Sequence, residues 1–301
     1  MQRKVSKIGP STLMVSLPTS WVKQHGIRKG DTVDVIEEGD KIILHAESPS
    51  SVVSSKTITV SGLKVMLNRV IGACYKKGYS EIKIVFDSHS QLAQLHEELQ
   101  RSWTGMEVVE QGNSFIVLKQ VSELKKEDFP SMLNRTFLFL VSTASEAEKA
   151  VSSGDQQALR MVSLRDPIQN RYCDFCRRVL NKMYIPGNTA LYYLVEQLER
   201  IGDLYRDLCK HLMEHPLKIR KEHATALHDI NLLLQQVYTL HYRFSLERFE
   251  EFGNYFYNLR ERLQSFLRAT QKKEEVFVLS LLCQINQSIF DMNGALLTTQ
   301  L

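Results

Sequence analysis

The chain has 301 residues, of which 43% are hydrophobic and 24% are charged, as is usual for globular proteins in water. No apolar run approaches the roughly 18 residues that a membrane span needs, and the first residues lack the layout of a signal peptide. We therefore expect a cytoplasmic protein without membrane insertion. The net charge of +4 is small, so any affinity for nucleic acid must come from local clusters of basic residues.

The first 46 residues predict a small β-rich unit. Apolar and polar residues alternate in short stretches, and glycine-containing turns separate these stretches. Proline at position 18 favours the start of a short helix. The expected elements are strands at 3–8 and 12–17, a helix at 18–25, and strands at 32–36 and 41–45.

Such a unit is too small to bury a core alone. Chains below roughly 40 to 50 residues usually need a metal, disulfides or a partner chain to fold. Residues 1–46 contain no cysteine and no cluster of metal ligands. The sequence therefore predicts a homodimer through residues 1–46, with strands exchanged between the two copies.

Basic residues are concentrated at the start of this unit. Residues 1–31 contain a single acid, Asp31, whereas acidic residues gather after it. A dimer with one basic edge is suited to the phosphate backbone of double-stranded DNA, although a solvated basic face gives the same pattern. The basic residues are Arg3, Lys4, Lys7, Lys23, Arg28 and Lys29.

Two motifs make this segment similar to a known family. The chain reads G-P-S-T-L-M-V-S-L-P at 9–18 and G-I-R-K-G-D at 26–31, and it thereby resembles the AbrB/MazE/SpoVT swapped-hairpin DNA-binding family. Many members read G-Q-I-T-I-P in place of the first motif, so the second strand is longer here. The resemblance implies an intertwined dimer that binds DNA. By position, it nominates Arg3, Lys4, Lys7, Ser11, Thr12 and Lys23 as DNA-binding residues.

The middle of the chain predicts a small α/β module. Residues 47–55 have the composition of a linker, and residues 56–121 follow the order β-α-β-α-β-β. This region has no glycine-rich phosphate loop and no cluster of catalytic polar residues, which is typical of a scaffold or a small sensor domain. The expected elements are strands at 57–60 and 81–86, helices at 63–77 and 89–102, and a hairpin of 106–109 with 114–118.

Residues 122–301 predict an all-helical region. Leucines and other apolar residues recur there at spacings of three and four, most regularly in the third helix. Six helices in about 180 residues fit two three-helix bundles. The expected helices lie at about 131–153, 167–184, 188–214, 219–245, 250–272 and 274–297.

An acidic stripe follows the third helix. Glu196, Glu199, Asp203 and Asp207 lie at spacings of three and four, so their carboxylates share one face. A cation with oxygen ligands would relieve their repulsion. The alternative is a salt-bridged surface, because basic residues are interspersed among the acids. These neighbours are Arg200, Arg206 and Lys210.

The same stretch carries a second family resemblance. The L-E-R-I-G-D motif at 198–203 resembles the PhoU family of phosphate-signalling regulators, whose motif supplies ligands to surface metal clusters. The resemblance implies that Glu199 and Asp203 bind a divalent cation, or iron or zinc. Asn170 stands where that family has an aspartate on the partner helix, which removes one charged ligand.

Two shorter motifs suggest metal chemistry but have simpler explanations. Cys173 and Cys176 form C-x-x-C without a second pair, and buried reduced thiols on one helix face explain them better than a zinc site. His211, Glu214 and His215 match the H-x-x-E-H of inverted zinc peptidases. Histidines at the end of a helix also complement its dipole, so a metalloenzyme is the lesser alternative.

Together these features predict a multidomain α+β protein. It would comprise a swapped-hairpin domain at 1–46, a linker at 47–55, an α/β module at 56–121 and PhoU-like helical bundles at 122–301. The predicted function is a non-enzymatic DNA-binding transcriptional regulator of phosphate uptake. The alternative is an adaptor that acts on a phosphate transporter, sensor protein or kinase by protein contact, without binding DNA.

Overall fold

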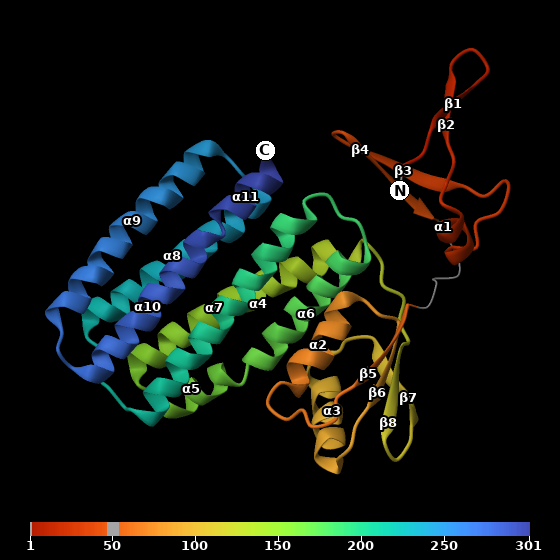
Figure 1. Cartoon of the computed structure of the whole chain (residues 1–301). Helices are drawn as coiled ribbons and strands as arrows, with labels where there is room; N and C mark the ends of the chain where they lie inside the picture. Colours follow the sequence, from red (N-terminus) through yellow and green to blue (C-terminus); the bar gives the residue numbers. More distant parts are fainter. Residues whose placement is uncertain (1, 47–53) are drawn as a thin grey trace.

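The structure, a computed structural model, describes residues 2–46 and 54–301 (Figure 1). It has the predicted mixture of a β-rich N-terminal unit, a small sheet with two helices and a large helical region. Most of the predicted linker, residues 47–53, lies outside the described residues. Its last residue, Ser55, already belongs to the first strand of the sheet module.

The N-terminal unit consists of two antiparallel hairpins with a short helix between them. The hairpins are separate two-stranded sheets. The predicted elements are all present, but the first strand starts at Val5 rather than at residue 3, and Pro18 precedes the helix instead of opening it. The elements are β1 (Val5–Ile8), β2 (Thr12–Val15), α1 (Thr19–Gln24), β3 (Val33–Glu38) and β4 (Lys41–Ala46).

The α/β module has the predicted element order. Its four-stranded sheet has the order β5-β6-β8-β7, in which β5 and β6 are parallel and the other neighbours antiparallel. Two helices cover one face, and the core between them and the sheet includes Leu67, Ile71, Ile82 and Ile116 (Figure 1). The elements are β5 (Ser55–Thr59), α2 (Leu67–Lys77), β6 (Glu81–Val85), α3 (His89–Ser102), β7 (Met106–Gln111) and β8 (Phe115–Gln120).

The helical region contains the six predicted helices and two more. The additional short helix α5 follows a complete stop signal: Gly154 ends α4 in the left-handed conformation, and the Asp155 side chain accepts hydrogen bonds from the backbone N–H groups of Gln157 and Ala158. The last predicted helix is interrupted at Met292. The elements are α4 (Asp128–Ser153), α5 (Gln156–Ser163), α6 (Asp166–Lys182), α7 (Asn188–Glu214), α8 (Lys221–Tyr242), α9 (Leu246–Ala269), α10 (Lys273–Asp291) and α11 (Asn293–Gln300).

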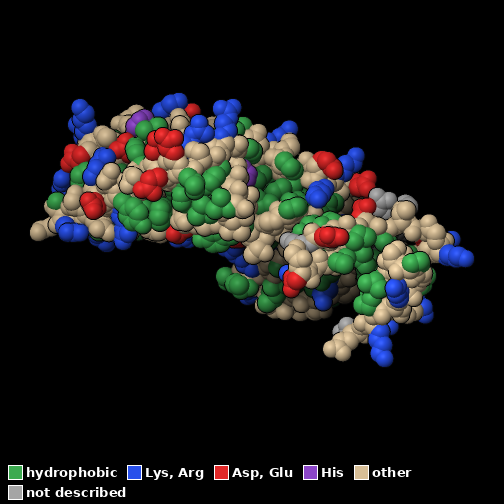
Figure 2. Space-filling view, turned by 90° about the horizontal axis from the view of Figure 1, so that it is seen from above, with side chains coloured by type: hydrophobic (Ala, Val, Ile, Leu, Met, Phe, Trp, Pro, Cys, Tyr) green, Lys and Arg blue, Asp and Glu red, His purple; other side chains and the backbone are tan. Residues whose placement is uncertain are grey.

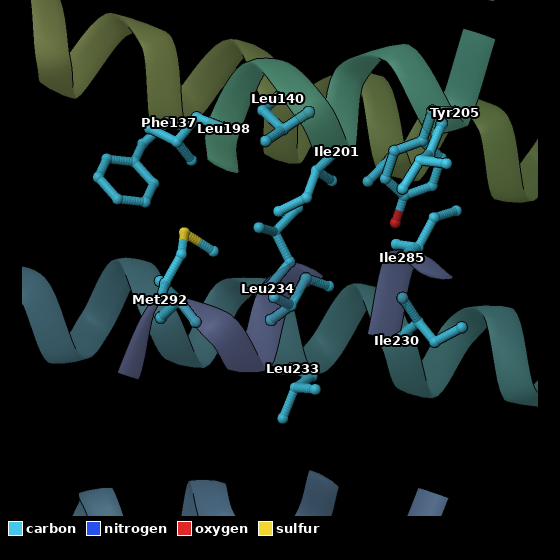
Figure 3. Close-up of a cluster of buried hydrophobic side chains, with 14 of the residues drawn as sticks. Phe137, Leu140, Leu198, Ile201, Tyr205, Ile230, Leu233, Leu234, Ile285 and Met292 are labelled. Atoms are coloured by element: carbon cyan, nitrogen blue, oxygen red, sulfur yellow. The ribbon is translucent and has the colours of Figure 1, made fainter. Parts of the chain in front are cut away.

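The six predicted helices pack as two groups of three, α4, α6 and α7 in one and α8, α9 and α10 in the other, as the prediction of two three-helix bundles expects, and one continuous core joins the two groups. Side chains of α4, α7, α8 and α10 point toward one another around Leu140, Ile201, Leu234 and Ile285 (Figure 3). The reason is the position of α7, which packs against α4, α5 and α6 and also against α10 and α11. Among the described residues, no helix is long and apolar enough to cross a bilayer.

A buried arginine of α6 connects the helical region to the α/β module. Arg178 is fully buried, and its guanidinium donates to the carbonyl oxygens of Tyr75 and Tyr79 at 2.6 and 2.8 Å and to Oε1 of Gln120 at 2.9 Å. These carbonyls lie at the end of α2, where the helix dipole favours a cation. The backbones approach closely at Gly78, where an added Cβ would lie 3.1 Å from Cβ of Lys182.

Replacing Arg178 with Met should lower the free energy of unfolding by about 3 kcal/mol, because one buried and two partly buried acceptors lose a charged donor. Urea denaturation measures this change. Lysine at the same position should recover only part of the loss, because its single ammonium group cannot donate to all three acceptors as the planar guanidinium does. Arg135, which is exposed on α4, is the matched control, and R135M should change stability by less than about 0.5 kcal/mol. Equal stability of R178M and R135M would contradict the role of Arg178.

The burial of the His241 ring in the helical core can be tested by the pH dependence of stability. It lies 5.5 Å from the ring of Phe137 and 4.7 Å from that of Tyr242, and burial lowers its pKa to about 4. In the unfolded chain the pKa of histidine is about 6.5. Between these values the unfolded chain binds a proton that the folded protein does not. The free energy of unfolding therefore falls as the pH falls from about 6.5 to 4.

The variant His241→Gln should lack this contribution. Relative to the variant, the wild type should lose on the order of 2 kcal/mol between pH 7 and pH 4. Chemical denaturation at a series of pH values measures the difference. The control is His89→Gln, because His89 is exposed at the start of α3. A constant difference between wild type and H241Q across this range would show that the imidazole is not buried in the folded state.

Candidate nucleic-acid interface

The N-terminal unit leaves its apolar side chains uncovered. Among the described side chains of residues 2–44, none is buried. Val5, Leu13 and Val15 are 60, 68 and 55% exposed, although they occupy strands. At the right-hand end of Figure 2, hydrophobic side chains and Lys or Arg side chains lie next to one another on the surface. A strand surface of this kind normally packs against another layer.

The strand register divides the first hairpin into two faces. Val5 pairs with Val15 and Lys7 pairs with Leu13, and directly opposite residues of an antiparallel pair point to the same side. One face therefore carries these four residues. The other face carries Ser6 with Met14 and Ile8 with Thr12. The first face is the more apolar of the two, with Lys7 as its charged member.

The predicted DNA-binding residues are exposed, but they do not form one cluster within a single chain. Arg3 and Lys4 precede β1 at the open end of the hairpin, whereas Ser11 and Thr12 lie at its turn. Lys7 and Thr12 point to opposite faces. The sixth residue, Lys23, lies in the last turn of α1. Their role in DNA binding stays a prediction.

Two other basic residues of the unit lie in the turn that leads into β3. The backbone N–H of Arg28 donates to Oδ2 of Asp31 at 2.7 Å, and the N–H of Asp31 donates back to the carbonyl of Arg28. This reciprocal pair orders the G-I-R-K-G-D turn. It explains why an aspartate is useful there without any contact to DNA.

In the helical region, the acidic stripe of α7 lies against a buried arginine that the sequence analysis did not single out. Arg177 of α6 is 1% exposed, and its guanidinium nitrogens lie 2.7 Å from Oδ1 of Asp174, 2.6 Å from Oε1 of Glu196 and 2.5 Å from Oε2 of Glu199. Burial raises the pKa of the Glu199 carboxyl to about 7, although Arg177 acts to lower it. The first half of the stripe is therefore occupied by a guanidinium.

The second half of the stripe surrounds Arg206. Its guanidinium lies 2.9 Å from Oδ1 of Asp166, 2.5 Å from Oδ1 of Asp203 and 2.9 Å from Oδ1 of Asp207. Burial raises the pKa of Asp203, against the effect of Arg206. Asn170 donates from Nδ2 to Oδ2 of Asp166 at 3.2 Å, so it supports this second cluster.

These contacts bear on the predicted metal ligands. Glu199 and Asp203 belong to two different arginine-centred clusters, and each already contacts a guanidinium. As arranged, each of these carboxylates pairs with an arginine, so a divalent cation bound here would have to displace a buried or half-buried guanidinium. Metal binding by Glu199 and Asp203 stays a prediction. The sequence offered one signal for the first cluster: Arg177 lies between the apolar residues Cys173, Cys176 and Leu180 of the same helix, where a buried arginine needs acidic partners.

The two cysteines of the C-x-x-C motif are both fully buried, as expected. Cys173 lies 3.8 Å from Nε2 of Gln169, and Cys176 lies 3.9 Å from Oγ1 of Thr136. Burial raises the pKa of Cys176 to about 12. Both groups are therefore inert thiols within the core.

Comparison with protein families identifies the N-terminal segment. Residues 7–52 match the family described as "Antidote-toxin recognition MazE, bacterial antitoxin". The prediction of an AbrB/MazE-type domain is confirmed for this segment. A comparison with curated proteins finds no significant match.

Comparison with solved structures finds PhoU proteins. The chain is similar to the phosphate transport system regulatory protein PhoU from Streptococcus pneumoniae, with 13% identity, coverage of 57% of this chain and 92% of that chain, and a TM-score of 0.47. Two PhoU-like proteins from Shewanella oneidensis MR-1 are 14% identical, cover 55% of this chain and 95% of theirs, and give TM-scores of 0.40 and 0.39. The descriptions of these matches name an antitoxin and phosphate regulatory proteins.

Proposed function

We propose that this protein is a dimeric DNA-binding transcriptional regulator. The observation that carries the proposal is the N-terminal unit with no buried side chain among those described in residues 2–44, within a segment that matches the MazE family. A unit without a core acquires one by pairing with a second copy. The basic residues at its start then occur twice in the assembly.

The apolar face of the first hairpin supports the dimer. Val5, Leu13 and Val15 are each more than half exposed. Complete burial of such a side chain contributes roughly 1.5 to 3 kcal/mol, and a symmetric interface gains each contribution twice. Two copies of this hairpin therefore have enough apolar surface to offset a large part of the entropy lost on association.

The charge of the same unit supports DNA as the partner. Arg3, Lys4 and Lys7 are exposed on or just before β1. In a dimer they provide six cations, which can neutralise about six phosphates. Because these contacts are made with the backbone, they position the protein, and groove-facing residues such as Ser11 and Thr12 supply sequence preference.

The helical region is proposed as the part that senses the phosphate-transport state. This proposal rests on the L-E-R-I-G-D motif of α7, which resembles the PhoU family. Arg178 anchors α6 to the α/β module. In the sequence, this module lies between the N-terminal unit and the helical region. A partner bound by the helices can then change the spacing of the two DNA-binding ends.

The dimer is tested by replacing Leu13 with Asp. Two buried leucines would become charged, so the dimer dissociation constant should rise by roughly 100-fold or more. Analytical ultracentrifugation of the full chain measures this change. The matched control is Thr12→Asp, one residue away on the opposite face of the same hairpin, and it should leave the dimer intact. A wild type that is monomeric at micromolar concentration would refute the proposed dimer.

DNA binding is tested by salt dependence and by alanine variants. For six phosphate contacts, a plot of log affinity against log salt concentration should have a slope of about −5. The triple variant R3A/K4A/K7A should reduce affinity by at least about tenfold and flatten the slope. Fluorescence anisotropy with a labelled duplex measures both quantities.

The control for this experiment removes the same charge elsewhere in the unit. The variant R28A/K29A/K41A changes three exposed basic residues of the turn before β3 and of β4, and it should bind DNA with nearly the wild-type slope. If both triple variants lose affinity equally, the loss reflects the total charge of the unit, and the assignment of Arg3, Lys4 and Lys7 as the DNA-binding residues is wrong. If the wild type binds no duplex, the protein acts as an adaptor. If the wild type binds DNA as expected, mapping of the bound genomic sites names the regulated pathway.

A further inference from the structure

Two histidines meet at the end of α7. His211 lies in its last turn and His215 is the residue that ends it, four positions later, so both side chains project from the same face. Their ring centroids are 4.9 Å apart. The sequence motif H-x-x-E-H pairs them with Glu214, but in the structure the neighbouring carboxylate is that of Glu274, the second residue of α10.

The three side chains have the separations of ligands to one ion. Nε2 of His211 lies 3.1 Å from Oε2 of Glu274, and one possible ligand atom of each of the three residues lies within 4.8 Å of the others. With bond lengths near 2.1 Å, two ligands of a tetrahedral zinc ion are roughly 3.4 Å apart. Movements of about 1 Å, made mainly by the more exposed side chains of His215 and Glu274, would complete this arrangement.

One of the ligand atoms is left without a hydrogen bond. Nε2 of His211 is buried from water, and its close contact with Glu274 does not have hydrogen-bond geometry. Phe277 stacks on the His211 ring at 4.2 Å and so limits its rotation. A buried ring nitrogen that is held in place beside a carboxylate and makes no hydrogen bond is suited to a metal ion.

The surroundings allow an ion to enter. The three residues line a cavity of about 480 Å³ that is open to solvent, together with Lys273 and Phe277. Lys273 places one positive charge nearby, so a cation must be held by strong ligand bonds rather than by charge alone. Two imidazoles and one carboxylate select zinc and similar transition-metal ions over magnesium or calcium.

The geometry points to a transition-metal site formed by His211, His215 and Glu274, with water as the fourth ligand. The bound ion would join the C-terminal end of α7 to the N-terminal end of α10 across residues 215–272. This site is separate from the acidic stripe of Glu199 and Asp203 and needs neither of them. It is also independent of DNA binding by residues 1–46.

The test is a titration of the full-length protein with zinc chloride in competition with a chromophoric chelator. We expect one zinc ion per chain. H211A, H215A and E274Q should each weaken binding by at least about 100-fold, whereas E214Q should retain the wild-type affinity. His228→Ala is the second control, because His228 pairs with Glu148 elsewhere on the surface. Circular dichroism in the presence of EDTA verifies that each variant is folded.

Two further measurements accompany the titration. Cobalt(II) bound at the site should give the strong visible absorption of a four-coordinate ion, and zinc should displace it. Zinc should also raise the melting temperature of the wild type and not that of E274Q. The site is refuted if the wild type binds no zinc at a stoichiometry of one, or if H211A and E274Q bind as tightly as the wild type. Loss of binding in E214Q but not in E274Q would overturn the assigned carboxylate.

Discussion

Two buried arginines on α6 set the arrangement of most of this protein. Arg177 and Arg178 are neighbours in sequence, and successive helical residues point about 100° apart, so they serve different partners. Arg178 donates to the end of α2 and to Gln120, whereas Arg177 contacts acids of α6 and α7. A buried guanidinium is tolerated only when acceptors surround it. The position of the α/β module and that of α7 are therefore both tied to α6.

This constraint changes the meaning of the acidic stripe. On α7 alone, four carboxylates at helical spacing have the arrangement of ligands for a cation. In the folded chain, Arg177 and Arg206 lie among them and supply the positive charge. The site with metal-ligand geometry lies at the other end of the same helix, where His211 and His215 meet Glu274. The two ends of α7 thus have different chemistry.

The N-terminal unit differs from the helical region in the burial of its apolar side chains. The helices bury their apolar side chains in one continuous core, and their buried arginines lie among acids and carbonyl oxygens. The first hairpin, in contrast, exposes Val5, Leu13 and Val15 beside basic residues. This contrast agrees with the proposed dimer, because a second copy would give the exposed apolar side chains of the hairpin a core.

The order of elements, the limits of α7 and the incompleteness of residues 1–46 followed from the sequence, because periodicity, capping residues and segment length act locally. Even α5 had a local signal in Gly154 and Asp155. The partners of the charged side chains did not follow, and neither did the packing of the two three-helix groups into one core. Glu199 meets Arg177 and His211 meets Glu274 only because α6, α7 and α10 pack together. Such pairings depend on helix packing between distant segments, and the spacing of residues within one helix does not predict them.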